Sequence, residues 1–131
     1  MPPQPLPANP LRIFVLNDHQ AFLQALERFL DQEPDLMVIG KGNAAPHRLE
    51  PVIQARPDVV IVDPEIHDFE VGEIVRKLRS GLAGSRIIVL TMNDDEKFKH
   101  ASLAAGADDF ILKTNATDQL VPSIRQARHT P

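Results

Sequence analysis

Short runs of β-branched and aliphatic residues alternate along the chain with longer stretches in which apolar residues recur at helical spacing. The short runs predict strands and the longer stretches predict amphipathic helices. The predicted strands are residues 11–16, 36–40, 58–63, 86–91 and 110–112. The predicted helices are residues 18–32, 47–55, 71–80, 96–105 and about 117–128. Because right-handed crossovers place such helices over both faces of a sheet, this order predicts an α/β protein with a five-stranded, doubly wound parallel sheet.

Prolines, acids and glycines mark where several of these helices are expected to begin, bend or end. Pro51 and Pro122 fall inside helical stretches, where the missing backbone N–H is expected to shorten or distort the helix. Asp94 or Asp95 is the expected N-cap of the fourth helix. Gly106 suits the end of that helix because glycine tolerates a positive φ.

The first ten residues differ in composition from the rest of the chain. They hold five of the twelve prolines and little apolar surface, which predicts a disordered Pro-rich tail at 1–10 followed by a single domain at 11–131. With 14 basic and 18 acidic residues the net charge is -4, which argues against direct nucleic-acid binding by this segment. The chain has no cysteine and no recognisable signal or membrane-spanning segment, so we expect a cytoplasmic protein with no membrane partner.

Polar residues follow four of the predicted strands at their carboxyl ends. They are Asn17 and Asp18 after the first strand, Asp63 at the end of the third, Thr91 at the end of the fourth and Lys113 after the fifth. Any one of them alone is an ordinary turn or cap residue. Ligands of doubly wound sheets bind beyond the carboxyl ends of the strands, so together these residues predict one shared site.

The residue types at this edge suit phosphoryl transfer assisted by Mg²⁺. An ionised Asp63 can attack phosphorus and form an acyl phosphate. Magnesium prefers oxygen ligands, which Asp18, Asp63 and the backbone carbonyl of Glu65 can supply. Thr91 can donate a hydrogen bond to one phosphoryl oxygen, and Lys113 can offer an ammonium to another.

Four motifs carry a resemblance to a known family. They are LNDHQ at 16–20, PDVVIVD at 57–63, IIVLTM at 87–92 and AAGADDFILK at 104–113. With them, residues 11 to about 128 resemble the receiver domain of bacterial two-component response regulators, and most closely the NarL/FixJ subfamily. Its members usually carry a LuxR-type helix-turn-helix domain after the receiver. The resemblance implies a flavodoxin-like sheet of strand order 2-1-3-4-5, and a signalling switch that regulates transcription rather than an enzyme.

Roles for individual residues follow from the resemblance. It implies that Asp63 accepts a phosphoryl group from a sensor histidine kinase or a phosphotransfer protein, and that Asp18 binds Mg²⁺. Thr91 and Lys113 are expected to bind the phosphoryl oxygens, while Phe110 is the aromatic switch that turns inward when Thr91 moves. The output face is expected on the fourth helix, fifth strand and fifth helix, with a homodimer through the last helix and strand.

The chain departs from the family pattern at two places. Asn17 stands where the family usually has a second acid, so we expect it to reach the metal only weakly, through a water, and to weaken magnesium binding. Pro64 and Glu65 follow the phosphoacceptor position directly, which changes the loop and adds a carboxylate. These departures leave open a degenerate receiver that acts as a phosphorylation-independent interaction module.

Two enzyme-like alternatives fit the sequence poorly. A haloacid-dehalogenase-type phosphatase requires an aspartate two residues after its nucleophile, but position 65 is Glu. A flavodoxin-like flavin protein requires a phosphate loop rich in Ser, Thr and Gly after the first strand, where this chain has NDHQ.

Overall fold

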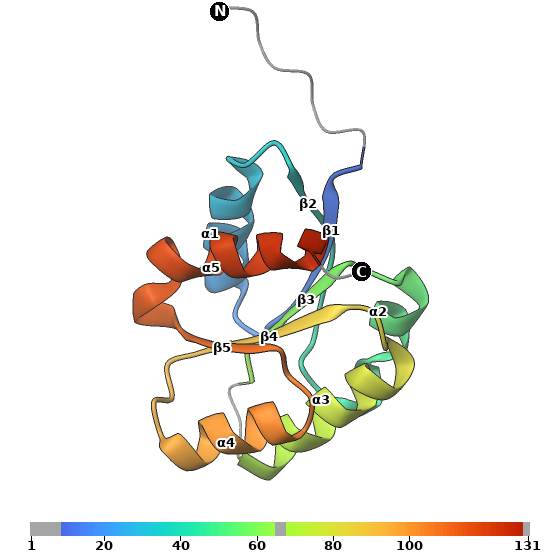
Figure 1. Ribbon diagram of the computed structural model, residues 1–131, viewed down its shortest axis with the longest axis vertical. Coiled ribbons are helices and arrows are strands. Elements are labelled where there is room, and N and C mark those ends of the chain that lie inside the picture. Colours follow the sequence, from blue (N-terminus) through green and yellow to red (C-terminus); the bar gives the residue numbers. More distant parts are fainter. Residues whose placement is uncertain (1–8, 65–67, 130–131) are drawn as a thin grey trace, which may run out of the picture.

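The structure, a computed structural model, describes residues 9–64 and 68–129. Its centre is a five-stranded parallel sheet of order β2-β1-β3-β4-β5 (Figure 1). The strands are β1 Leu11–Leu16, β2 Leu36–Gly42, β3 Val59–Val62, β4 Arg86–Thr91 and β5 Asp109–Leu112. The predicted fold class and strand order are therefore confirmed.

In the part of the chain that the structure describes, five α-helices cover the two faces of the sheet. They are α1 Gln20–Asp31, α2 Glu50–Ala55, α3 Asp68–Gly81, α4 Glu96–Ala104 and α5 Ala116–Arg125. Short 3₁₀ turns occupy Pro46–Arg48, Lys113–Asn115 and Gln126–His129. In Figure 1, α1 and α5 lie on one side of the sheet and α2, α3 and α4 on the other, as right-handed crossovers require.

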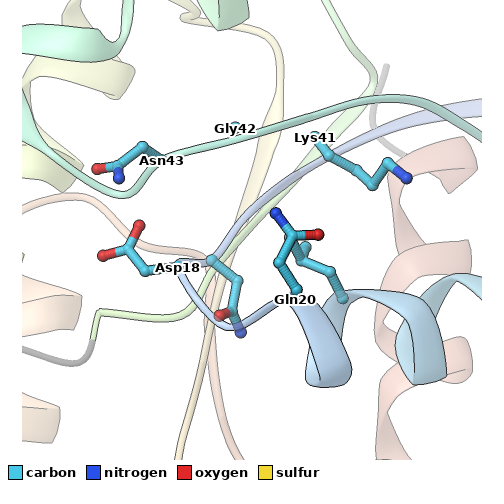
Figure 2. A pocket seen from close by; sticks show the side chains of 7 residues that line it. Asp18, Gln20, Lys41, Gly42 and Asn43 are labelled. Atoms are coloured by element: carbon cyan, nitrogen blue, oxygen red, sulfur yellow. The ribbon is translucent and has the colours of Figure 1, made fainter.

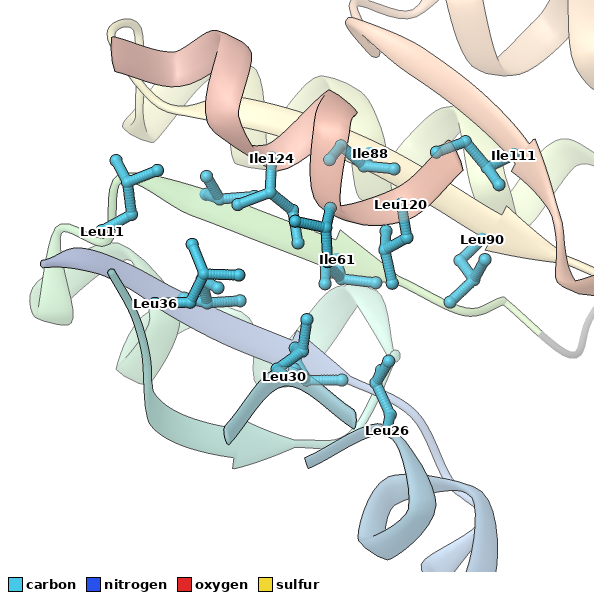
Figure 3. Packing of buried hydrophobic residues seen from close by; sticks show 14 of the residues in the cluster. Leu11, Leu26, Leu30, Leu36, Ile61, Ile88, Leu90, Ile111, Leu120 and Ile124 are labelled. Carbon is cyan, nitrogen blue, oxygen red and sulfur yellow. The ribbon is translucent and has the colours of Figure 1, made fainter. Parts of the chain in front are cut away.

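Side chains of each strand alternate between two apolar cores, because successive residues of a strand point to opposite faces. One core joins Ile61, Ile88 and neighbouring strand residues to α1 and to Leu120 and Ile124 of α5 (Figure 3). The other joins Phe14, Leu16, Val60, Val62, Ile87 and Val89 to α2, α3 and Phe98 of α4. All four residues of β3 are fully buried, which is why that strand reads as a continuous apolar run.

The signals at the helix ends have identifiable effects. Pro51 lies in the first turn of α2, where its missing N–H has no intrahelical acceptor, and the helix is short, as predicted. The α5 helix continues through Pro122. Asp95 is the N-cap of α4, with its side chain accepting a hydrogen bond from the backbone N–H of Lys97 at 2.9 Å. Gly106 follows α4 with φ +120, a conformation that favours glycine.

Several boundaries differ from the prediction. β2 extends two residues further, to Gly42, while β3 is one residue shorter at each end. α3 begins at Asp68, three residues before the predicted start. Extension of β2 has a consequence for the site, because it carries the chain to the carboxyl edge of the sheet beside the end of β1.

Candidate phosphoacceptor site

The ends of β1 and β3 place Asn17 and Asp63 side by side at the carboxyl edge of the sheet. Leu16 at the end of β1 pairs with Val62 at the end of β3, so Asn17 and Asp63, which directly follow these residues, are neighbours. The backbone N–H of Asp63 donates to the carbonyl of Leu16 at 2.8 Å, and that of Asn17 donates to the carbonyl of Gly42 at 3.0 Å. Both residues are about 2% exposed. The backbone therefore fixes where these two buried polar side chains begin.

Two donors from different segments converge on the Asp63 carboxylate. The side-chain Nδ2 of Asn17 donates to Asp63 Oδ2, and Lys113 Nζ forms an ion pair with the same oxygen. Lys113 is the first residue after β5, and its side chain is only 15% exposed. A buried carboxylate is costly unless it is paired and hydrogen-bonded, and here it is both. Three residues predicted from the strand ends thus share one small volume.

An aromatic ring from α1 supports the lysine. Lys113 Nζ lies 3.9 Å from the centroid of the Phe22 ring, which is cation–π geometry. The sequence identified Phe22 only as part of the apolar face of a helix. Phe22 lies in the first turn of α1, soon after Asp18, and this position in the sequence indicates that its ring lies near the carboxyl edge of the sheet. The ring and the carboxylate together hold the ammonium in one position.

Asp18 lies at the mouth of a pocket beside this cluster. The pocket has a volume of about 290 Å³ and is lined by Asn17, Asp18, Gln20, Leu23, Lys41, Gly42 and Asn43. In Figure 2 the side chains of Asp18 and Asn43 face one another across it. Asp18 is exposed, and its Oδ1 accepts a hydrogen bond from the backbone N–H of Ala44 at 3.3 Å. Lys41, Gly42 and Asn43 form one wall of the pocket. The sequence did not predict them as site residues, because they reach the pocket only through the two-residue extension of β2.

The predicted switch residues occupy the next two strands. Thr91 is 4% exposed at the end of β4, where its Oγ1 accepts a hydrogen bond from the backbone N–H of Asn93 at 3.1 Å. Phe110 on β5 is half-buried and packs edge-to-face on Phe98 of α4, with ring centroids 5.8 Å apart. Thr91 pairs with Leu112, the residue before Lys113. The hydroxyl and the ammonium therefore start from adjacent strand ends.

The donor set available for a metal consists of few oxygens. Glu65, the predicted source of a ligating carbonyl, lies outside the described residues. Within 9–64 and 68–129 no group of three or more His, Cys, Asp or Glu side chains is arranged to hold a metal ion. Magnesium often keeps several waters and binds through one or two carboxylates, so Asp18, which lines the pocket, and Asp63, which is hydrogen-bonded to the pocket-lining Asn17, would suit a hydrated ion.

A guanidinium at the opposite end of the sheet holds β5 against its neighbours. Arg79 of α3 donates to the carbonyl of Gly106 at 2.8 and 3.1 Å, to that of Ser85 at 2.7 Å and to Asp108 Oδ2 at 2.6 Å. The same carboxylate oxygen accepts a hydrogen bond from the backbone N–H of Ile87 at 2.8 Å. These bonds connect α3, β4 and the turn before β5, and so help to fix the position of β5, the strand that Lys113 follows.

A second arginine ties the end of α5 to the turn before β2. Arg125 donates to Asp35 Oδ2 at 2.9 Å and to Glu33 Oε2 at 3.2 Å. The hydrogen bond with Asp35 raises the pKa of Arg125 above its ordinary value, despite the opposing effect of burial. The guanidinium therefore stays charged at any working pH and holds the last helix in place.

Comparison with known proteins identifies the family. Residues 13–125 match the family model described as the response regulator receiver domain. The chain belongs to the response regulator receiver family. Its curated relatives are LuxR/NarL-type response regulators, so the family and subfamily predicted from the motifs are confirmed.

Two curated relatives show the extent of the match. The transcriptional regulatory protein DegU of Brevibacillus brevis is 28% identical over 117 residues, which cover 89% of this chain and 50% of DegU. The transcriptional regulatory protein LiaR of Bacillus subtilis is 27% identical over 117 residues, covering 89% of this chain and 56% of LiaR. This receiver chain thus spans about half the length of the curated relatives it matches.

Solved structures share the fold at lower identity. The response regulator domain of Thermotoga maritima CheB superposes with a TM-score of 0.79 at 24% identity, covering 94% of this chain and 99% of that one. A LuxR-family DNA-binding response regulator from Staphylococcus aureus superposes with a TM-score of 0.78 at 17% identity, covering 89% and 98%. None of the helices that the structure describes is long and apolar enough to cross a membrane.

Proposed function

We propose that this receiver is a phosphorylation switch in which Asp63 accepts a phosphoryl group from the phosphohistidine of a sensor kinase or of a phosphotransfer protein. The observation that carries the proposal is the convergence of Lys113 Nζ and Asn17 Nδ2 on the buried Asp63 carboxylate. A structural ion pair needs no pocket beside it, whereas Asn17, which donates to this carboxylate, also lines a cavity together with Asp18. Membership of the receiver family supports the same chemistry.

Each residue has a defined part in the transfer. A carboxylate oxygen of Asp63 attacks phosphorus in line, a P–O bond forms, and the P–N bond to the donor imidazole breaks with its electron pair leaving on nitrogen. Lys113, already held against Asp63 and Phe22, stabilises charge on a phosphoryl oxygen without reorganising. Asp18 and Asp63 would hold Mg²⁺, and the ion would supply positive charge to balance the phosphoryl oxygens.

Thr91 and Phe110 convert the modification into a change of surface. The Thr91 hydroxyl turns to donate to the new phosphoryl oxygen, leaving its present bond from the Asn93 N–H. Phe110 then moves inward from its half-buried contact with Phe98. The surface that changes is the face made by α4, β5 and α5, through which the phosphorylated receiver forms a homodimer.

The output we propose is control of transcription by a cytoplasmic regulator. DegU and LiaR are named as transcriptional regulatory proteins and are about twice as long as the region that matches this chain. The DNA-binding function belongs to a helix-turn-helix segment outside residues 1–131, in keeping with the acidic net charge of -4 for this receiver.

One observation favours a second candidate, a receiver that signals without phosphate. Asn17 and Lys113 already engage an oxygen of Asp63, so a donor and a cation within the chain compensate this carboxylate in the resting site. Such a protein would act as an interaction module through the same face.

Incubation with acetyl phosphate and Mg²⁺, followed by intact mass measurement, separates the two candidates. The switch predicts a single phosphoryl adduct that is lost on mild alkaline treatment and is missing from Asp63→Asn. An unmodified wild-type mass under conditions that label a known receiver would favour the interaction module.

A further inference from the structure

The orientation of the Asn17 amide is fixed by its neighbours. The backbone N–H of His19 lies 2.6 Å from Asn17 Oδ1. A backbone N–H can only donate, so the atom that faces it must be the amide oxygen. The nitrogen is thereby turned toward Asp63, where it donates to Oδ2. Asn17 is 2% exposed, so these protein groups are the main partners of its amide.

This orientation is the wrong one for a metal ligand. A cation needs an oxygen lone pair, and the Asn17 oxygen is engaged by His19. The amide nitrogen carries two N–H donors and no lone pair for a metal, so it can stabilise the negative charge of Asp63 but cannot bind a cation. Flipping the amide would break both hydrogen bonds inside a buried site and set two N–H groups against each other at His19.

We propose that the Asn17 amide and the Lys113 ammonium together compensate the Asp63 carboxylate in the unphosphorylated protein, and that a divalent cation binds in competition with the amide. Asn17 is then a positioning residue that acts as a donor to Asp63, in place of the water-mediated metal contact that its position in the motif suggests. The inference deepens the proposed function, on which it rests for the role of Asp63, but the competition itself is a property of the unmodified site.

The charges around the site predict the direction in which a change of charge at position 17 alters cation binding. Among the residues that the structure describes, Asp18 and Asp63 supply carboxylates at this edge, and Lys113 is the cation paired with Asp63. Lys41, which also lines the pocket, is engaged by Glu27 at 3.1 Å. An acid at position 17 would replace a donor to Asp63 with a further carboxylate, which would repel Asp63 and increase the need for a cation beside it. We therefore expect the wild-type site to be stable without a metal and the Asn17→Asp variant to depend on one.

The first test is a calorimetric Mg²⁺ titration of the unphosphorylated protein, with no phosphodonor present. Asn17→Asp is expected to bind Mg²⁺ more tightly than wild type, on the order of tenfold or more. Asn17→Ala is expected to bind at least as tightly as wild type, because it removes a competitor. Weaker binding by Asn17→Ala would show that the amide is a ligand and would overturn the inference.

Thermal unfolding supplies a readout that affinity alone does not. In EDTA, Asn17→Asp should unfold at a lower temperature than wild type and regain the loss with Mg²⁺, while wild type should respond little. Gln20→Glu is the charge control, because it adds an acid to the same pocket and leaves the amide in place. A Mg²⁺ response of Gln20→Glu equal to that of Asn17→Asp would reduce the effect to net charge and contradict the proposal.

The side-chain amide signals of Asn17 in ¹H–¹⁵N spectra report the same competition directly, and serve if Asn17→Ala fails to fold. Saturating Mg²⁺ is expected to shift the Asn17 NH₂ pair as its bond to Asp63 is lost, whereas an unmoved pair at saturation would refute it. Because these measurements need no phosphorylation, their failure is distinguishable from a failure of Asp63 to accept phosphate.

Discussion

Arg79 is predicted to be the main polar support of the strand that carries Lys113, and Arg79→Ala tests this. The guanidinium makes three well-formed sets of bonds, to the Gly106 and Ser85 carbonyls and to Asp108, at 2.6–3.1 Å. At about 1 kcal/mol for each partner the sum is about 3 kcal/mol. The ion pair with Asp108 is 27% and 37% exposed, so its share is discounted. We expect Arg79→Ala to lower the free energy of unfolding by about 2 kcal/mol.

Urea unfolding followed by circular dichroism at 25 °C measures this loss. Arg76→Ala is the matched control, because Arg76 is exposed on the same helix, and it should change the free energy by less than about 0.5 kcal/mol. Arg79→Lys should fall between, since an ammonium cannot replace a planar group with five donors. A loss for Arg79→Ala no larger than that of the control would refute the idea that these bonds hold α3, β4 and β5 together.

Three further changes test the core, the turn before β5 and the site. Ile61→Ala, at a fully buried position in β3, should cost about 3–4 kcal/mol in urea unfolding, and a cost near 1 kcal/mol would argue against a well-packed core. Gly106→Ala should cost more than about 1 kcal/mol because φ is +120 and the added Cβ would meet Arg79 Cγ at 3.2 Å; an unchanged melting temperature would contradict that strain. Lys113→Ala should slow labelling by acetyl phosphate by roughly tenfold or more, and an unaltered rate in a stopped time course would exclude a role for the ammonium.

Much of the fold could be predicted because its signals are local. The β-branched runs at 59–62 and 86–91 mark strands buried on both faces, and β4 was predicted to the residue. Alternation of strand and helix leaves few topologies once right-handed crossovers are required. The convergence on Asp63 was predictable for a related reason, because the carboxyl ends of parallel strands share one edge. Lys113 could be assigned to that edge without any knowledge of its contacts.

What could not be predicted depends on contacts between distant segments. The direction of the Asn17 amide follows from the His19 N–H, and periodicity carries no information about that bond. Phe22 is one of several apolar residues on α1; its place in the first turn indicates the edge on which it lies, but its contact with Lys113 depends on how distant segments pack together. The role of Arg79 could not be predicted from the sequence, because the carbonyls of Ser85 and Gly106 that accept its hydrogen bonds are backbone groups in two turns, and no residue type marks them.

Locating the phosphoryl group tests the proposed switch most directly. Borohydride reduces an acyl phosphate to an alcohol, so an aspartyl phosphate becomes homoserine at the position that was modified. After treatment with acetyl phosphate and Mg²⁺, reduction and peptide sequencing by mass spectrometry should find homoserine at position 63 of the wild-type protein and nowhere in Asp63→Asn. Homoserine at position 18, a reduced side chain at Glu65, or an unmodified peptide at full donor concentration would contradict the assignment of Asp63 as the phosphoacceptor.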